Sequence, residues 1–495
     1  MATRGSIAID LGAESGRVMV GVLRAGGLSL HEAHRFLHAP VATSGAPAWD
    51  LPLIWREIRE GLKRAAAWAV GQDVEIASVG VDTWGVDFAL LGKGDELLAT
   101  PRCYRNSEHA EGLAILDQRL GRAGVYGLTG VRSMALNTSS QLAGWVARDP
   151  GVFRAAGRLL FMPDLLHYML GGVASTEQSI ASTSQMLDAR TRDWSVEVLR
   201  AIGLPRDILP TIVQPGTALG PVRREITEET GLPASVMVIA PAAHDTASAV
   251  VGTPLSGSRC CYLSSGTWSL LGVELDRPIL SEESRAADFS NEHGVDGTTR
   301  FLKNVIGLWL VQEIKRDLAR SGVDMSYEQL AGEAERATPF RSRVDVEAPE
   351  LALAGDMIRK VRALARSTGD PEPGTPGELV RACLEGLAGA YARTLEQIER
   401  LTGRAIGTIH VIGGGVKNTL LCQMTASATG RRVLAGPGEA TAMGNLLVQM
   451  MALGEVAGLA RARELVSRSC RPVEYLPASG AGWERLTGRA VESSR

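Results

Sequence analysis

The sequence predicts an α/β protein with more than one domain and a repeated structural unit. Its 495 residues exceed what a single hydrophobic core usually organises, so two or three domains are expected. Strand–turn–strand patterns with Ser- and Gly-rich turns occupy residues 6–23 and 257–274, and helical segments lie between and after them. The similarity of the two hairpins suggests a duplicated domain, in which each copy contributes one anion-binding turn to a shared cleft.

Composition limits the classes of partner. With 45% hydrophobic and 22% charged residues and a net charge of -3, the chain is typical of a globular protein without a basic surface for nucleic acid. Its six cysteines form no C-x-x-C pair and no metal-ligand spacing with the eight histidines. The N-terminus lacks a signal-peptide layout, and no apolar run reaches the ~18 residues that span a bilayer. We therefore expect a reduced, cytoplasmic protein, monomeric or homodimeric, that binds neither membrane nor nucleic acid.

The first hairpin carries a carboxylate at the end of its first strand, at Asp10. Backbone N–H groups in the turn at Gly12, Ser15 and Gly16 can face inward around an anion, and Arg17 adds positive charge. Asp10 is placed to hold a hydrated Mg²⁺ ion, although a plain hairpin with a glycine turn is an equally good interpretation. No Walker-type loop occurs and lysine is scarce, so a bound nucleotide would depend on backbone amides, arginine and a metal.

A helix and two further strands follow this hairpin. Asp50 caps a helical segment of amphipathic periodicity, and two strands of alternating polarity then flank residues 83–85. Trp84 suits stacking on a sugar, although a tryptophan is more often part of the core, and Gly85 permits a small polar ligand to approach the backbone. The polar loop at 101–108 suits either a cleft or a solvated surface.

The segment around residue 244 joins a buried strand to a carboxylate. An apolar run ends at Pro241, then His244, Asp245 and Thr246 follow, with only small residues after them. Asp245 suits a general base, because geometry and desolvation can be set together at the end of a buried strand. The alternative is a helix N-cap formed by Asp245 or Thr246.

The C-terminal half contains two predicted helices and glycine-rich turns. Asn304 is expected to cap a helix that includes Gln312, which would place both residues near one face, about two turns apart. A long helix is predicted over 379–401, ended by Gly403. Residues 408–415 predict a strand that runs into three glycines, where a flat ring or a ribose can approach the backbone.

The order of these motifs resembles that of the FGGY carbohydrate kinases, and most closely the rhamnulokinase subfamily, from about residue 6 to about residue 475. The resemblance rests on DLGA at 10–13, DTWGVDF at 82–88, HDTASAV at 244–250, LSSGTWSL at 263–270, and KN at 303–304 with GLWL at 307–310. It implies an α/β fold of two actin-like, ribonuclease-H-like ATPase domains with a cleft between them. These domains would comprise residues 1–253 and 254–480, followed by a C-terminal tail at 481–495.

The resemblance also implies ATP-dependent phosphorylation of L-rhamnulose at its 1-hydroxyl, with Mg²⁺ near Asp10. Asp245 matches the general base of the family. The positions that match its sugar-binding residues are Gly85, His244, Asp245, Thr246 and Asn304. The positions that match its ATP-binding residues are Ala13, Glu14, Ser15, Gly16, Arg17, Thr267, Gln312 and Gly414.

Two departures from the family pattern bear on these expectations. Glu14 stands where serine is frequent, and its carboxylate beside phosphate groups would have to turn away or bind the metal. Asn106 and Glu108 replace an Asp and an Arg, which keeps a related ketose such as L-fuculose or L-ribulose open as the substrate. A non-catalytic sugar or nucleotide sensor is the alternative from another class, and the intact Asp245 with both phosphate turns argues against it.

Overall fold

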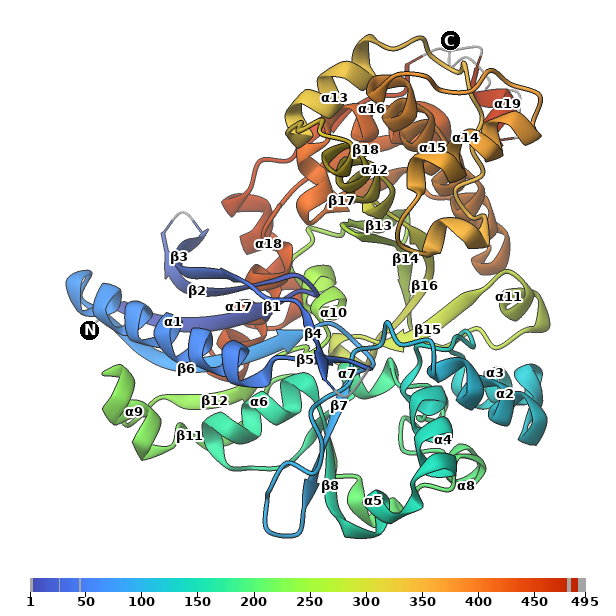
Figure 1. The fold of residues 1–495 in the computed structure, drawn as a ribbon. Helices are drawn as coiled ribbons and strands as arrows, with labels where there is room; N and C mark the ends of the chain where they lie inside the picture. The colour runs from blue at the N-terminus through green and yellow to red at the C-terminus, as the bar shows by residue number, and fades with distance from the viewer. Residues whose placement is uncertain (1–2, 26, 44–45, 479–481, 488–495) are drawn as a thin grey trace. The chain divides into compact units, whose positions relative to one another are not determined.

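A six-stranded sheet organises the N-terminal part of the computed structural model, which describes residues 3–25, 27–43, 46–478 and 482–487 (Figure 1). The sheet order is β11-β12-β6-β1-β2-β3. These strands are β1 (Thr3–Leu11), β2 (Ser15–Arg24), β3 (Gly27–Leu37), β6 (Val74–Thr83), β11 (Thr217–Pro221) and β12 (Met237–Ala240). β1 pairs with β2 in antiparallel and with β6 in parallel direction, as the predicted hairpin at 6–23 requires.

Side chains of β1 alternate between the two faces of this sheet, and both faces are buried. Ile7 and Ile9 are fully buried in a core with α1 (Leu51–Gly71) and α6 (Met162–Gly171). Ala8 points to the opposite face and packs with α17 (Ala440–Ala452). Because successive side chains of a strand point to opposite faces, a strand without polar alternation indicates burial on both sides.

The first helix begins as its sequence predicts. The side chain of Asp50 accepts a hydrogen bond of 3.0 Å from the backbone N–H of Leu53, which caps α1. Its buried residues recur at helical spacing, from Ile54 and Ile58 to Leu62 and beyond.

A seven-stranded sheet follows in the order β15-β16-β14-β13-β17-β18-β19. Its strands are β13 (Cys260–Ser265), β14 (Trp268–Leu275), β15 (Phe289–His293), β16 (Thr299–Ile306), β17 (Thr408–Ile412), β18 (Arg432–Ala435) and β19 (Val473–Tyr475). The long predicted helix is α15 (Pro376–Thr402), which starts with a capping box of Thr375 and Glu378. It ends at Gly403, whose φ of 67° lies in the left-handed region that favours glycine.

Six strands of each sheet repeat one topology. The order β2-β1-β6-β12-β11 corresponds to β14-β13-β17-β18-β19, and a further strand (β3 or β16) extends each on the same side. The central hairpin is antiparallel, the next two pairings are parallel and the last is antiparallel in both sheets. The duplication expected from the two hairpins is therefore confirmed.

The expected helix at Asn304 is wrong. Asn304 lies in the strand β16, and the helix α12 (Trp309–Arg320) begins only after Gly307. A Cβ atom on Gly307 would lie 2.6 Å from the carbonyl oxygen of Gly266, so the chain must pass close to the β13–β14 turn before it can enter the helix. Asn304 and Gln312 consequently share no helix face.

The remaining elements lie in the segments that connect the strands of the two sheets, or after the last strand. The shorter strands are β4 (Pro40–Thr43), β5 (Ala46–Trp49), β7 (Phe88–Gly92), β8 (Ala156–Phe161), β9 (Thr176–Glu177) and β10 (Ile212–Val213). The helices are α2 (His109–Arg119), α3 (Gly121–Thr129), α4 (Thr138–Arg148), α5 (Pro150–Ala155), α7 (Gln178–Ser182), α8 (Val196–Ile202), α9 (Arg224–Thr230), α10 (Asp245–Val251), α11 (Glu282–Ala286), α13 (Tyr327–Arg336), α14 (Met357–Ser367), α16 (Thr419–Thr429), α18 (Leu459–Ser469) and α19 (Trp483–Thr487).

The chain divides into two compact units. The first comprises Met1–Pro254, Glu274–Phe301 and Ala440–Ser469, and the second comprises Leu255–Val273, Leu302–Glu439 and Cys470–Arg495. Of the expected tail at 481–495, residues 483–487 form α19, and residues 481 and 488–495 lie outside the described residues.

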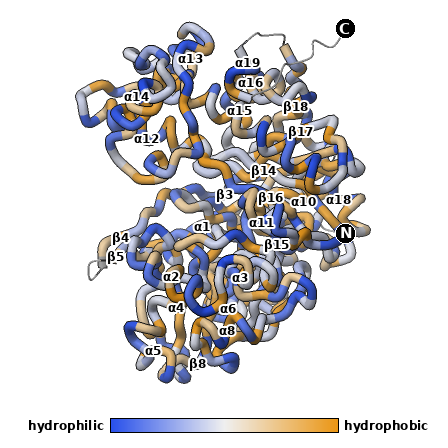
Figure 2. The backbone as a smooth tube through the Cα atoms, turned by 90° about the vertical axis from the view of Figure 1, so that its right-hand side faces the viewer, coloured by the Kyte–Doolittle hydropathy of each residue, from blue (hydrophilic) through white to orange (hydrophobic). Residues whose placement is uncertain are grey.

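Apolar and polar segments alternate along the chain (Figure 2). Among the described residues, no helix combines the length and apolar character needed to cross a membrane. All six cysteines are described, and each is a free thiol.

Candidate active site

Three carboxylates meet at one edge of the first sheet. Asp10 on β1 and Asp82 on β6 are register partners at the carboxyl ends of neighbouring parallel strands, and they are 2% and 0% exposed. The next strand, β12, ends at Ala240, and Asp245 follows a few residues later. His244, beside it, forms a β-bridge with Thr83 at the end of β6. The predicted metal position and the predicted base are thus brought to the same sheet edge.

The carboxylates at this edge influence one another. Burial, and then repulsion from Asp10, raises the pKa of Asp82 well above its ordinary value. The Oδ1 atom of Asp82 is buried without a hydrogen-bond partner, while Oδ2 accepts a bond of 2.6 Å from the side-chain amide of Asn445 on α17. Asp82 belongs to a motif noted in the sequence, but no role was predicted for it, because its surroundings come from distant segments.

Asp245 is the first residue of the short helix α10, and its N-cap residue is His244. The N-cap alternative for Asp245 or Thr246 is therefore wrong. Asp245 Oδ1 accepts hydrogen bonds from the backbone N–H and the hydroxyl of Thr246, at 2.6 and 3.1 Å, and its side chain is 30% exposed. Burial raises its pKa, Asp10 adds to the rise, and His244 opposes it. A carboxylate that is accessible and more basic than usual is suited to accept a proton.

Two buried residues hold the backbone of this turn in place. The carboxylate of Glu177 accepts a 3.0 Å hydrogen bond from the N–H of Ala243, and the hydroxyl of Ser179 accepts a 3.1 Å bond from the N–H of His244. Glu177 also accepts the hydroxyl proton of Ser179. Sequence reasoning missed both residues, because no local pattern near position 177 indicates a partner about 65 residues further along the chain.

The turn of the first hairpin is closed by a backbone hydrogen bond of its own, so the Gly12 N–H is not directed at an anion as expected. The Gly12 N–H donates to the carbonyl of Ser15 at 2.9 Å, and Arg17 Nε donates to Asp10 Oδ2 at 2.9 Å. Gly16 cannot be replaced without rearrangement, since a Cβ atom there would lie 2.4 Å from the ring of Phe36. Ala13, Glu14 and Ser15 are partly exposed in the turn.

Glu14 interacts with His38. The carbonyl of Glu14 accepts a 3.2 Å hydrogen bond from the N–H of His38, and its carboxylate attracts the imidazole electrostatically. Burial is nevertheless the dominant effect on His38 and lowers its pKa.

The corresponding turn in the second unit brings two predicted ATP-binding residues together. Gln312 on α12 donates to the hydroxyl of Thr267 at 3.3 Å, and the Gly266 N–H donates to the carbonyl of Trp268 at 2.9 Å. Thr267 follows β13, whose neighbour β17 ends at the three predicted glycines. A Cβ atom on Gly414 would meet nothing within 4 Å, so its surface is open to a ligand.

Trp84 belongs to the core. It is 5% exposed, its ring centroid lies 4.1 Å from that of Trp49, and its indole N–H donates to Asp87 at 3.0 Å. The carboxylate of Asp87 also accepts the indole N–H of Trp49, at 2.7 Å, and burial raises its pKa to about 7. Stacking of Trp84 on a sugar is therefore not supported.

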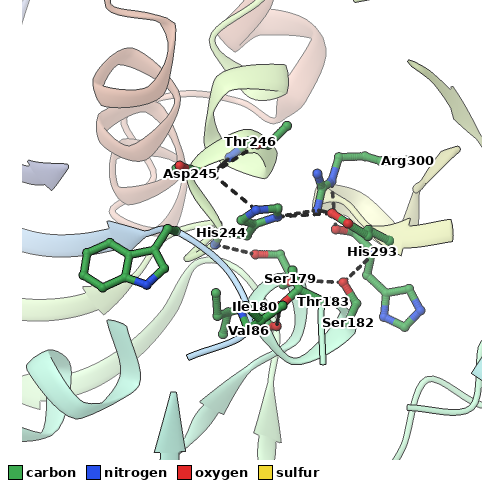
Figure 3. Close-up of polar contacts among 12 residues, drawn as sticks. Val86, Ser179, Ile180, Ser182, Thr183, His244, Asp245, Thr246, His293 and Arg300 are labelled. Atoms are coloured by element: carbon green, nitrogen blue, oxygen red, sulfur yellow. Dashed lines mark hydrogen bonds and ion pairs between the residues drawn. The ribbon is translucent and has the colours of Figure 1, made fainter. Parts of the chain in front are cut away.

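Gly85, by contrast, is partly exposed and precedes a strained residue. Val86 has a φ of 71°, which is unusual for a β-branched side chain. Its N–H donates to the hydroxyl of Thr183 at 3.1 Å (Figure 3), and its carbonyl accepts a hydrogen bond of 2.6 Å from the hydroxyl of Thr138. Such strain persists only where neighbouring groups hold it, and it is frequent near binding sites.

The two unusual residues of the 101–108 loop have local structural partners. Asn106 is 9% exposed, and its Oδ1 accepts a 3.1 Å hydrogen bond from the N–H of Glu108. The carboxylate of Glu108 pairs with Arg102 and Arg148, at 3.4 and 3.3 Å.

Comparisons with known proteins agree with this arrangement. The N-terminal domain model of the FGGY family of carbohydrate kinases matches residues 6–252, and its C-terminal domain model matches residues 261–453. The chain belongs to the FGGY family of carbohydrate kinases. As a carbohydrate kinase it acts on a sugar, with ATP and a divalent metal ion.

Similar proteins cover nearly the whole chain. A protein of Bacteroides thetaiotaomicron named rhamnulokinase is 42% identical over 477 residues, which are 96% of each chain. A protein of Enterococcus faecalis with the same name is 38% identical over 96% of this chain and 94% of its own length. Among solved structures, a ligand-bound xylulose kinase from Lactobacillus acidophilus superposes with a TM-score of 0.82 at 17% identity, covering 98% of this chain and 96% of that one. This last likeness shows the shared two-domain fold.

Proposed function

We propose that this carbohydrate kinase transfers the γ-phosphoryl group of ATP to the 1-hydroxyl of L-rhamnulose, a step of L-rhamnose breakdown in the cytoplasm. The supporting observation is the alignment, over 96% of both chains, with a protein named rhamnulokinase at 42% identity. The matching motifs include residues 82–88 and 244–250, which surround the acidic edge of the first sheet.

In this proposal Asp245 is the general base. Its carboxylate accepts the proton of the sugar hydroxyl as that oxygen attacks the γ-phosphorus, and the bond from phosphorus to the bridging oxygen of ADP breaks. The raised pKa and partial exposure of Asp245 support this role. Gly85, His244, Thr246 and Asn304 would contact the sugar.

ATP would be held largely by backbone. The turn at 13–17 and Thr267 would each bind phosphate oxygens, Gln312 would support Thr267, and Gly414 would face the adenosine. Phosphoryl transfer depends on positioning and charge stabilisation, which preorganised N–H groups supply. The functional division would follow residues 1–253 and 254–480, in a monomer or a homodimer.

The residues at the acidic edge fit a Mg²⁺ ion. Asp10 would hold it, since Mg²⁺ commonly binds one or two carboxylates, phosphate oxygens and water. The unpartnered Oδ1 of Asp82 and the repulsion among the three carboxylates are consistent with a nearby cation. When bound, the ion would neutralise the charge of the phosphates, and Arg17 lies close enough to Asp10 to add to that effect.

The test is ADP release with Mg-ATP across L-rhamnulose, L-fuculose, L-ribulose, D-xylulose, D-fructose and glycerol. A clear preference in kcat/KM for L-rhamnulose is expected. Preference for another ketose would contradict the substrate but retain the mechanism, and it would direct attention to Asn106 and Glu108. Absence of turnover with every sugar, despite sugar or ATP binding, would contradict catalysis itself.

A further inference from the structure

Four side chains of the first unit, those of Arg300, Glu292, His244 and Asp245, form a continuous chain of polar contacts that ends at Asp245 (Figure 3). His244 Nε2 lies 3.3 Å from Asp245 Oδ1, and His244 Nδ1 lies 3.2 Å from Glu292 Oε2. Arg300 Nη2 lies 2.9 Å from the same oxygen of Glu292 and 3.1 Å from His244 Nδ1. Glu292 and Arg300 come from β15 and β16, far from His244 in sequence.

The Glu292–Arg300 pair is almost fully enclosed. Arg300 is 0% exposed, and the side chain of Glu292 is 8% exposed. Although burial opposes ionisation, Arg300 and His244 lower the pKa of Glu292 to about 2. Glu292 is therefore a carboxylate near neutral pH and can only accept hydrogen bonds.

The Glu292–Arg300 pair determines which nitrogen of His244 faces the sugar site. Arg300 Nη2 donates a hydrogen bond to Nδ1 and is itself held by Glu292 at 2.9 Å, so Nδ1 is the acceptor and the N–H of the ring is on Nε2. The other nitrogen, Nε2, is then the atom presented to Asp245. The orientation and the tautomer of a histidine are commonly set in this way by the partner of its second nitrogen.

The supporting strands are themselves anchored close to the turn. The hydroxyl of Ser182 on α7 accepts a 2.9 Å hydrogen bond from the N–H of His293, and Arg300 Nε donates to the carbonyl of His293 at 3.2 Å. The same helix, α7, contains Ser179, which binds the N–H of His244. One helix thus ties together the backbone of His244 and the strand that carries Glu292.

We propose that Glu292 is a positioning residue for His244: it holds Arg300, whose N–H donates to Nδ1, so that the Nε2 side of the ring meets Asp245 and the bound sugar. The inference rests on the proposed function only in taking His244 and Asp245 as sugar-facing residues. Glu292 acts through His244 and touches neither sugar nor ATP.

A double-mutant cycle of Glu292→Gln and His244→Gln tests this role. In the wild-type background, Glu292→Gln should lower kcat/KM for the sugar roughly 10- to 100-fold, as is typical when the group that orients a ligand-binding histidine is removed. KM for ATP should stay within about twofold, because a positioning effect is confined to the residue positioned. In the His244→Gln background, Glu292→Gln should have almost no further effect on the sugar constants.

Glu385→Gln is the matched control. Glu385 is 1% exposed, pairs with Arg381 Nε at 2.7 Å and lies in the second unit, on α15. This change should lower stability while leaving KM for the sugar unchanged. Additive effects of Glu292→Gln and His244→Gln, or equal effects of Glu292→Gln on the sugar and ATP constants, would overturn the proposal.

Two provisions keep the outcome decisive. If Glu292→Gln fails to fold, Glu292→Asp replaces it, since it keeps the charge but withdraws the carboxylate from Arg300 by one methylene. If the wild-type enzyme prefers another ketose, the cycle is run with that ketose. The identity of the substrate and the role of Glu292 are then decided separately.

Discussion

The two sheets have the same strand order and carry different chemistry at their strand ends. In the first unit, β1 and β6 end at Asp10 and Asp82, and β12 leads to Asp245. In the second unit the equivalent strands β13, β17 and β18 lead to the turn at Thr267, to residues 413–415 and to Gly436. The comparison teaches that the fold determines where a ligand can meet backbone, while a few side chains decide which task each copy performs.

The difference is electrostatic. The first edge gathers carboxylates whose pKa values burial raises, including Asp82 and Asp245. The second offers hydroxyl groups and glycine backbone, which suit a nucleotide without adding negative charge. This difference between an acidic edge in the first unit and a neutral edge in the second leads to four predictions.

The largest effect is expected at the acidic edge, from Asp245→Asn. The substitution keeps the shape of the side chain and removes its basicity, so kcat should fall about 10²- to 10⁴-fold. Steady-state ADP release with L-rhamnulose measures this loss, and calorimetry with ATP should show binding nearly unchanged. Turnover equal to that of the wild type would remove Asp245 from the role of base.

A smaller loss is expected from Asp10→Asn. Its amide oxygen can still accept a hydrogen bond from Arg17, but it is a weaker ligand for a divalent cation. We expect kcat/KM to fall roughly 10²-fold, as when one electrostatic group is removed from a reacting site. Titration with Mg²⁺ should also require more metal for half-maximal rate. An unaltered metal titration would show that the ion is held elsewhere.

At the neutral edge, Gly414→Ala should raise KM for ATP about 10-fold without affecting stability, since steric contact with the ligand is the only change. The protein itself leaves room for the new methyl group, because nothing lies within 4 Å of it. Gly415→Ala is the contrasting variant, since its Cβ would lie 2.0 Å from the hydroxyl oxygen of Ser265 and should impair folding. If Gly414→Ala bound ATP normally, adenosine would not lie against residue 414.

The last prediction concerns stability in acid rather than catalysis, and it distinguishes the first unit. His167 on α6 is buried, its Nε2 accepts the N–H of Val81 at 2.9 Å, and burial lowers its pKa to about 3. Between pH 6.5 and 3 the unfolded chain binds a proton here that the folded chain does not. The free energy of unfolding should therefore decrease as the pH is lowered from 6.5 to 3, by up to about 1.4 kcal/mol per pH unit from this group.

His167→Gln keeps an acceptor for Val81 and removes the titration. Urea unfolding between pH 7 and pH 4 should show a shallower loss of stability in this variant than in the wild type. Parallel curves for the two proteins would show that His167 is protonated in the folded state.

Local features of the structure were predictable because they depend on residues close in sequence. The capping of α1 by Asp50 and the end of α15 at Gly403 follow from hydrogen bonds within a few residues. Both hairpins and the position of Asp10 at a strand end follow from local alternation and turn residues. The resemblance of residues 244–250 to the family motif is also the reason for proposing Asp245 as the base.

Other features depended on pairing across the chain. Asn304 was expected in a helix, but hydrogen bonds to distant strands keep residues 299–306 extended, and tertiary pairing overrides local preference. Trp84 carried two interpretations in the sequence, and only its packing against Trp49 placed it in the core.

By itself, then, the sequence determined the two repeated hairpins and the acidic strand end, since short-range hydrogen bonding and burial periodicity specify them. The resemblance of its motifs also indicated the family of the chain. Only the tertiary structure decided what surrounds those groups: Asn445 beside Asp82, Glu177 beneath Ala243, and Glu292 beside His244. Each of these partners is separated by tens to hundreds of residues from the group it holds. Sheet order, rather than local sequence, brings such pairs into contact.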